Sequence, residues 1–283
     1  MTRCTTVLYR KGLIDHNSCA KLTARFPWAI VRIMHDRPIL SSTSTDRLPW
    51  SPWLQLIRFR NQTGTALLLL PVCWALVLAA RGLPSWELFA IFTAGAFLMR
   101  SAGVILNDLA DQSFDRRVTR TKSRPLASGE LTRSQAFVLL ALLLAAAGLL
   151  LVFLNPLTRW LAPIAMALAA LYPFAKRFHI PQAILGIAFG WGTIMAWTAT
   201  RNTVEPQAWI VFAATVVWAI AYDTIYAVQD QEDDRRIGVK SSALLFGSAL
   251  WIAVGLALGT MLVLLVLAGR LDRKSTPSEL QSH

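Results

Sequence analysis

The chain has 283 residues, of which 55% are hydrophobic and only 16% charged, and its formal net charge is +12. Because ordinary soluble domains carry roughly 25% charged residues, this composition excludes a typical soluble enzyme and indicates an integral membrane protein. The three cysteines and four scattered histidines form no CxxC pair and no histidine cluster, which argues against a disulfide framework or a zinc site. The positive charge lies between the apolar runs, a pattern typical of membrane topology and not of nucleic-acid binding.

The N-terminal fifty residues differ from the rest of the chain, being basic, rich in Ser and Thr and poor in acids. We predict an N-terminal arm or targeting segment over residues 1–50, a transmembrane domain over 51–270 and a polar tail over 271–283. An over-extended gene start, with Met34 as the initiator, is the alternative interpretation of the first segment.

Seven apolar segments follow the arm, each long enough or nearly long enough to cross a bilayer, which takes about 20 residues. The sequence therefore predicts an all-α fold, a polytopic transmembrane helical bundle with about seven spans. The predicted spans lie near residues 65–80, 86–106, 134–154, 157–175, 182–200, 207–228 and 243–269.

The basic residues between the spans predict the orientation in the membrane. Twenty-one Lys and Arg residues lie in the N-terminal segment and the loops on one side, against six on the other. By the positive-inside rule, the N-terminus and the two long polar loops face the cytoplasm. We expect a bacterial inner membrane, with the mitochondrial inner membrane as the alternative.

A charged motif is repeated after two of the apolar segments. "NDLADQSFDRR" (107–117) follows the second predicted span, and its Asp111-x3-Asp115-Arg-Arg pattern recurs 119 residues later as Asp230-x3-Asp234-Arg-Arg, after the sixth. A single copy would be explained as readily by a solvated anchor at the end of a span. Two copies at matched positions predict two related halves that face one central cavity.

Helical spacing places the carboxylates of each copy together. Asn107, Asp111 and Asp115 are spaced i, i+4, i+8, and Asp223 lies seven residues before Asp230, so each set shares one helix face. Like charges at this spacing disfavour an isolated helix, and Mg²⁺, which prefers oxygen ligands and keeps substrate phosphates in its shell, would compensate them. The nearby Arg and Lys residues favour a phosphorylated ligand over a bare cation.

The two motifs resemble those of the UbiA superfamily of intramembrane prenyltransferases. The family's first motif, NDxxDxxxD, matches residues 107–115, and its second, ending in DxxxD, matches 230–234 with Asp223 upstream. The stretches "KSRPLASGELT", "ALYPFAKR", "ILGIAFGWGTIMAW" and "AYDTIYAVQDQEDDRRIGVKSSALLFG" resemble the 4-hydroxybenzoate polyprenyltransferase branch in particular. The resemblance covers about residues 53–250.

This resemblance implies a Mg²⁺-dependent reaction. A polyprenyl diphosphate would lose diphosphate, and the allylic cation would alkylate the ring carbon ortho to the hydroxyl of 4-hydroxybenzoate, a step of ubiquinone-type quinone biosynthesis. By similarity, the Mg²⁺–diphosphate site would consist of Asn107, Asp111, Asp115, Asp230 and Asp234. Further substrate-binding residues would be Arg120, Arg124, Tyr172 and Lys176 for the diphosphate and Arg100 for the benzoate carboxylate, while Asp223 would position or activate the acceptor.

Two departures from the family pattern keep alternatives open. In "RFRNQTG", Arg58 and Gly64 match the family, but Arg60, Asn61 and Gln62 replace the usual Asp, Lys and Pro. The family has nine spans and this chain about seven, so an inactive truncated variant is one alternative. A second alternative is an enzyme of the same superfamily that uses another acceptor, such as homogentisate or a dihydroxynaphthoate. The third alternative is a cation transporter or channel, which is disfavoured because the two motifs lie on the same side of the membrane.

Overall fold

The computed structural model describes residues 51–118, 121–175, 181–237 and 249–274. The chain divides into two units, residues 1–48 and 49–283, and all described residues belong to the second. The predicted N-terminal arm lies outside the described residues. The described ranges are helical and contain no strand: α4 Ser51–Leu56, α5 Thr63–Ala80, α6 Trp86–Asp115, α7 Pro125–Ser128, α8 Arg133–Leu150, η1 Leu151–Phe153, α9 Pro156–Ala175, α10 Pro181–Arg201, α11 Pro206–Ile237 and α13 Leu250–Lys274.

The predicted all-α membrane bundle is confirmed, and each predicted span corresponds to one long helix of the described part. Within that part, five helices are long and apolar enough to cross a membrane: Thr63–Ala80, Trp86–Asp115, Arg133–Phe153, Pro206–Val228 and Leu250–Arg273. The apolar part of α9 is shorter, Pro156–Leu171.

Several boundaries differ from the predicted ones. The helices α6 and α11 continue beyond the apolar residues and carry the charged motifs within their last turns. The final helix, Leu250–Lys274, extends past the predicted start of the polar tail, while residues 243–248 of the predicted last span lie outside the described residues. A hydropathy pattern marks where the apolar residues end, whereas a helix ends where its backbone hydrogen bonds end.

Local side-chain interactions and proline residues determine where several helices begin. The helix α8 begins with a capping box, in which Thr132 accepts from the Gln135 backbone N–H and the Gln135 side chain accepts from the Thr132 N–H. Proline is the first residue of α9, α10 and α11, where its missing N–H removes no helical hydrogen bond. Before α9, the Asn155 side chain accepts from the Thr158 N–H at 2.9 Å and donates to the Thr198 carbonyl of α10 at 2.7 Å.

Two main apolar cores hold the bundle together. One lies among α5, α10 and α11 and includes Leu76, Ile194, Trp197 and Val211, all essentially inaccessible to solvent. It is tightly packed, because a Cβ on Gly190 would lie 2.7 Å from the Phe212 ring. The other core joins α4, α6, α7 and α8 and contains the buried residues Leu56, Ala102, Ile105, Leu109, Leu126, Leu131, Ala136, Leu140 and Leu143. This second core lies beside the first charged motif.

A buried ion cluster joins three helices at the opposite end from the motifs. The carboxylate of Asp272, at the end of α13, is 3% exposed and accepts hydrogen bonds from Arg81 Nε at 2.7 Å and from Arg201 Nη2 at 3.1 Å. Arg81 follows α5 and Arg201 ends α10. The hydrogen bond to Asp272 raises the pKa of Arg81 above its ordinary value. The cluster ties the end of α13 to the rest of the bundle.

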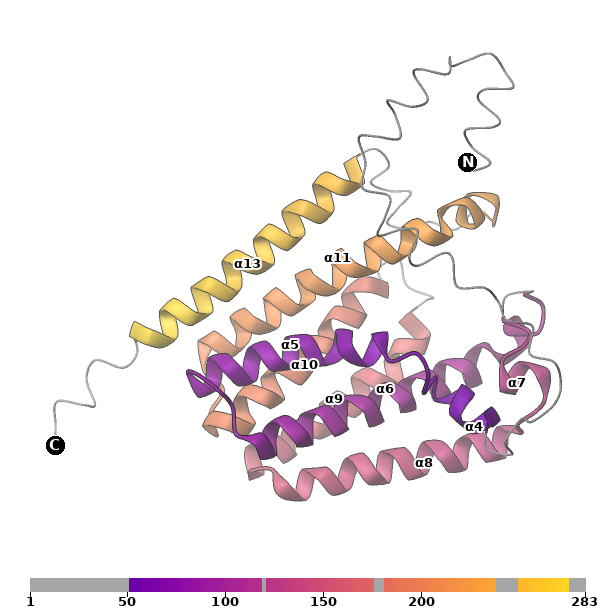
Figure 1. The fold of residues 1–283 in the computed structure, drawn as a ribbon, viewed down its shortest axis with the longest axis horizontal. Coiled ribbons are helices and arrows are strands. Elements are labelled where there is room, and N and C mark those ends of the chain that lie inside the picture. Colours follow the sequence, from indigo (N-terminus) through magenta and orange to yellow (C-terminus); the bar gives the residue numbers. More distant parts are fainter. Residues whose placement is uncertain (1–50, 119–120, 176–180, 238–248, 275–283) are drawn as a thin grey trace, which may run out of the picture. The chain divides into compact units, whose positions relative to one another are not determined.

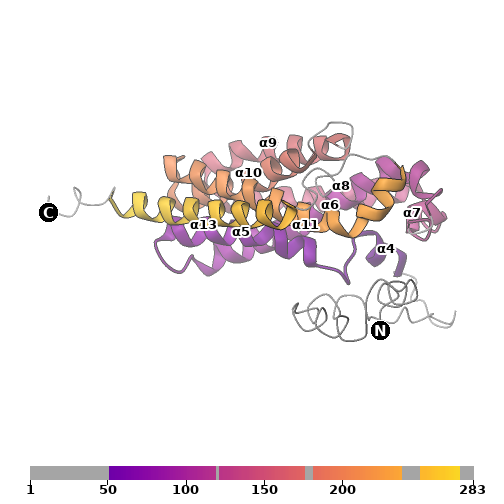
Figure 2. The same cartoon turned by 90° about the horizontal axis from the view of Figure 1, so that it is seen from above.

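The helices α6 and α11 end on the same side of the bundle, and the end of α6 lies beside α7 (Figure 1). The view from above agrees: the ends of α6 and α11 lie with α7, away from the C-terminal end of α13 (Figure 2). The two helices are similar in length, 30 and 32 residues, and each carries its D-x3-D-R-R sequence at this end. The repeated motif therefore occupies matching positions in the fold.

Candidate functional site

The first motif lies in the last turns of α6. Asp108 and Asp115 are buried, at 3% and 4% exposure, whereas Asn107 and Asp111 are half-buried. The two buried carboxylates are seven residues apart, which places them on nearly the same face of the helix. Asp111 also makes a polar or electrostatic interaction. Burial of two like charges requires positive partners, because unpaired carboxylates are costly away from water.

Arg124 supplies one of these partners. A single nitrogen, Nη1, donates to Asp115 Oδ2 at 2.7 Å and to Asp108 Oδ1 at 3.2 Å. The residue immediately precedes α7, and Gln112 fixes that short helix by donating to the Leu126 carbonyl at 2.8 Å. The loop after α6 therefore folds back to bring a guanidinium against the motif.

Arg58 supplies the second partner and comes from the segment before the first span. Its Nη2 donates to Asp108 Oδ1 at 3.3 Å. The backbone of Arg58 has a φ of 53°, an uncommon conformation for a residue other than glycine. The preceding helix α4 is anchored by the fully buried Leu56, which packs in the core with α6 and α7. The chain before the first span thus forms part of the site.

Arg100 lies two turns deeper on α6, within the apolar part of the helix. Its guanidinium packs on Gly64 of α5, where an added Cβ would lie 2.6 Å from Nε and 2.9 Å from Nη2. Its Nη1 is buried and has no hydrogen-bond partner among the described residues. Arg58 and Asp108 lie within electrostatic reach. Arg100 is thus a half-buried cation with one buried donor that has no hydrogen-bond partner within the described ranges.

Asp223 occupies a comparable depth on α11. Its carboxylate accepts a hydrogen bond from the Gln182 side chain of α10. The preceding residue, Tyr222, packs among aromatic rings: its ring centroid lies 5.7 Å from that of Trp218, and it stacks on Phe189 at 6.1 Å. The role of Asp223 in positioning an aromatic acceptor stays a prediction, motivated by its place within a membrane-spanning helix.

Part of the predicted site lies outside what the structure describes. The backbone of Asp230 and Asp234 belongs to α11 and that of Tyr172 to α9, but their side chains are not described. Arg120 and Lys176 fall outside the described residues altogether. Among the side chains that are described, no three His, Cys, Asp or Glu residues come close enough together to hold a metal ion. The metal assignment therefore stays a prediction.

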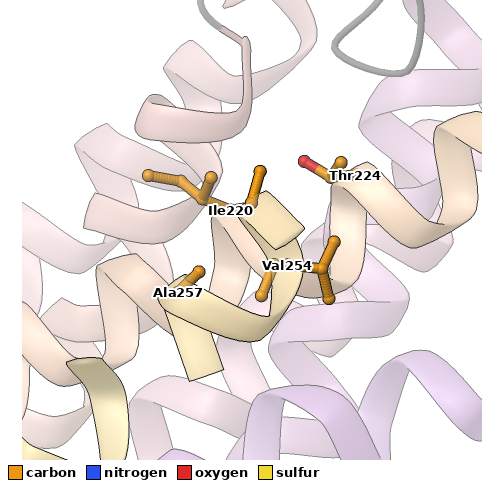
Figure 3. A pocket seen from close by; sticks show the side chains of 6 residues that line it. Ile220, Thr224, Val254 and Ala257 are labelled. Atoms are coloured by element: carbon orange, nitrogen blue, oxygen red, sulfur yellow. The ribbon is translucent and has the colours of Figure 1, made fainter. Parts of the chain in front are cut away.

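A small apolar pocket between α11 and α13 is distinct from the motif region (Figure 3). It encloses about 30 Å³ and is lined by Ile220, Ala221, Thr224, Ala253, Val254 and Ala257. The Thr224 hydroxyl is its polar atom, and this oxygen has no hydrogen-bond partner within the described ranges. A pocket of this size and chemistry suits neither a diphosphate nor an aromatic acid.

The packing gives contacts to three residues for which the sequence pattern predicts no role. Asp108 belongs to the family motif, Arg58 is a family match before the first span, and Gln182 stands in no motif. The i, i+7 spacing of Asp108 and Asp115 was the available signal for the first. Arg58 contacts Asp108, 50 residues later in the sequence, and Gln182 contacts Asp223, 41 residues later. Local sequence patterns do not reveal contacts over such separations.

The chain is similar to known proteins over most of its length. It is 46% identical over 237 residues to the 4-hydroxybenzoate octaprenyltransferase of Ectopseudomonas mendocina (strain ymp), covering 83% of this chain and 80% of that one. It is 48% identical over 220 residues to the enzyme of the same name from Cupriavidus necator, covering 77% of each.

Solved structures share the fold. A UbiA homolog from Aeropyrum pernix K1, in its apo form, superposes with a TM-score of 0.60 at 27% identity, covering 73% of this chain and 79% of that one. The fold also matches a UbiA homolog from Archaeoglobus fulgidus bound to DMAPP and Mg²⁺, with a TM-score of 0.57 at 18% identity and coverage of 80% and 86%. The model of the UbiA prenyltransferase family matches residues 68–273, and this chain is an integral membrane protein that belongs to that family.

Proposed function

We propose that this protein transfers a polyprenyl group from a polyprenyl diphosphate to the ring carbon ortho to the hydroxyl of 4-hydroxybenzoate, with release of diphosphate. The observation that carries the proposal is the carboxylate–arginine cluster at the end of α6, whose motif recurs at the matching end of α11. The names of the curated relatives support the choice of acceptor.

The donor set fits Mg²⁺. Carboxylate and amide oxygens are the ligands that this ion prefers, and it usually retains substrate phosphates as further ligands. Asp115 already accommodates a positive charge, the Arg124 guanidinium, at 2.7 Å. We infer that Asn107, Asp111 and Asp115 from α6, with Asp230 and Asp234 from α11, would hold Mg²⁺. The metal would neutralise the charge that develops on the departing diphosphate.

The chain's own residues bind and orient the two substrates. Arg124, together with Arg120 and Lys176, would bind diphosphate oxygens, and Tyr172 would help close the site. Arg100, with its buried Nη1 free of protein partners among the described residues, would receive the acceptor carboxylate. Asp223, held by Gln182, would orient the acceptor hydroxyl. The apolar helices would surround the prenyl chain and exclude water from the allylic cation.

The reaction would take place in a bilayer, on the face where the motifs lie. The excess of Lys and Arg on that side supports a cytoplasmic orientation. The bacterial origin of the similar enzymes supports an inner membrane.

Membranes that contain the protein test the proposal. They would be incubated with radiolabelled 4-hydroxybenzoate, prenyl diphosphates of several lengths, and Mg²⁺ with or without EDTA. We expect transfer that EDTA abolishes and that D111A and D230A reduce by at least about 100-fold, since each removes a predicted metal ligand. E87A is the matched control, because Glu87 is an exposed carboxylate in the first turn of α6, away from the motif.

Two results would contradict the proposal. Full activity of D111A and D230A would refute the metal assignment. Failure to label 4-hydroxybenzoate, together with transfer to homogentisate or a dihydroxynaphthoate in a competition assay, would identify a different acceptor.

A further inference from the structure

Arg124 bridges two buried carboxylates of the first motif. One nitrogen of its guanidinium contacts two carboxylates of α6, at 2.7 Å from Asp115 and 3.2 Å from Asp108. Asp115 is a predicted metal ligand, whereas Asp108 is buried and has Arg58 as a second cationic partner at 3.3 Å. The two carboxylates therefore differ: one is held by two arginines and the other by Arg124 alone among the ion pairs of the described residues.

The first motif is consequently close to electrically balanced without metal. The carboxylates of Asp108 and Asp115 pair with the guanidinium groups of Arg58 and Arg124, and Asp111 has an interaction of its own. A Mg²⁺ ion that approached Asp115 would be repelled by the guanidinium beside it, an interaction that is strengthened where water is excluded. Mg²⁺ would therefore bind Asp115 weakly until the Arg124 guanidinium paired with another anion.

We propose that Arg124 is a resident counter-ion of the first motif, and that it exchanges Asp115 for the substrate diphosphate. The consequence is that Mg²⁺ and prenyl diphosphate bind together, each promoting the other, and that Mg²⁺ alone binds weakly. This inference rests on the proposed function, because it assumes a diphosphate substrate at this site.

The geometry explains how Arg124 can exchange one partner while staying in place. Asp108 lies at 3.2 Å from the same nitrogen and is buried, so it retains the guanidinium when Asp115 is released. Arg58 Nη2 donates to the same oxygen of Asp108, Oδ1, at 3.3 Å, so that carboxylate has a second cationic partner that holds it in place. An arginine can donate through five N–H groups in a planar fork, so contacts to Asp108 and to a diphosphate oxygen are compatible. Asp108 is thus a positioning residue for Arg124.

Metal binding in the absence of substrate tests this inference directly. The protein would be reconstituted in lipid nanodiscs, and the EPR signal of free Mn²⁺ would be titrated for wild type, R124Q and R117Q. Arg117 is an exposed arginine of the same loop, so R117Q removes the same formal charge without removing the bridge between Asp108 and Asp115. We expect R124Q to bind Mn²⁺ about 3- to 10-fold more tightly than wild type, because it removes one competing cation whose side chain is itself partly exposed and screened by water. R117Q should match wild type.

The affinity for prenyl diphosphate should change in the opposite direction to the affinity for Mn²⁺. Geranyl S-thiolodiphosphate, an analogue that ionises slowly, would be titrated by calorimetry at fixed Mg²⁺. We expect R124Q to lose about 10-fold or more in affinity for it, because a charge-assisted contact to phosphate is missing. R124K, which keeps the charge without the planar fork, should fall between R124Q and wild type for both ligands and would show that the loop still folds.

The outcomes separate this inference from the proposed function. Equal or weaker Mn²⁺ binding by R124Q in the absence of substrate would overturn the counter-ion role, even in a protein that prenylates 4-hydroxybenzoate normally. A wild-type protein that binds neither Mn²⁺ nor the analogue would overturn the proposed function, and the inference with it. Opposite shifts in metal and diphosphate affinity would support the inference, since a purely structural role of Arg124 would weaken both.

Discussion

Replacing Gly64 with alanine should impair acceptor binding specifically. The added Cβ would lie 2.6 Å from Arg100 Nε, 2.9 Å from Nη2 and 3.2 Å from Cζ, whereas ordinary van der Waals contact begins at 3.4 Å. The guanidinium must therefore move by about 0.8 Å, the shortfall of the Nε contact. Since displacement of a binding group by about 1 Å can cost up to about 100-fold in rate, we expect the KM for 4-hydroxybenzoate to rise about 10- to 100-fold.

Stability should change little in this variant. The atoms that would be contacted belong to the end of a flexible side chain, which can move without shifting the backbone. Alanine is also favoured over glycine in a helix by up to about 1 kcal/mol. The unfolding temperature of G64A in detergent should therefore stay near that of wild type, so that loss of acceptor binding is not a consequence of unfolding.

Gly103 offers the matched control, because it lies on α6 three residues after Arg100 and a Cβ there would meet no atom within 4 Å. Initial rates would be measured with each substrate varied in turn. G103A should show wild-type kinetics, and G64A should keep the KM for the prenyl diphosphate within about two-fold, since only one binding interaction is lost. An unchanged KM for 4-hydroxybenzoate in G64A, or an equal rise in G103A, would refute the role of Arg100.

Three further predictions concern the bundle and the metal. D272N should lower the unfolding temperature in detergent by roughly 5 °C, because Arg81 and Arg201 lose their shared carboxylate, and an unchanged transition would show that the cluster does not secure α13. Gly190→Ala should destabilise the protein by about 1–3 kcal/mol, since its Cβ would lie 2.7 Å from the Phe212 ring; unaltered thermal unfolding would argue against close packing of α10 and α11. Removing divalent cations with EDTA should abolish prenyl transfer, and Mg²⁺ should restore it; activity that persists in EDTA would contradict metal dependence.

The sequence was sufficient to predict the class of fold and the place of the motifs. Apolar segments of bilayer length identify membrane helices because hydropathy depends only on the residues of each segment. The repeat of D-x3-D-R-R was visible for the same reason, since both copies are local strings at i, i+4 spacing. The structure confirms that both strings lie in the last turns of long helices at one end of the bundle.

Only the tertiary structure decided which charges meet. The contacts between Arg58 and Asp108, between Gly64 and Arg100, and between Arg81 and Asp272 join residues that lie 50, 36 and 191 positions apart. Such contacts depend on how the helices pack, and hydropathy is insensitive to which neighbour a helix face meets. The sequence alone therefore showed that this chain carries two sets of acidic residues in a membrane, and packing decided that the first is already held by arginines.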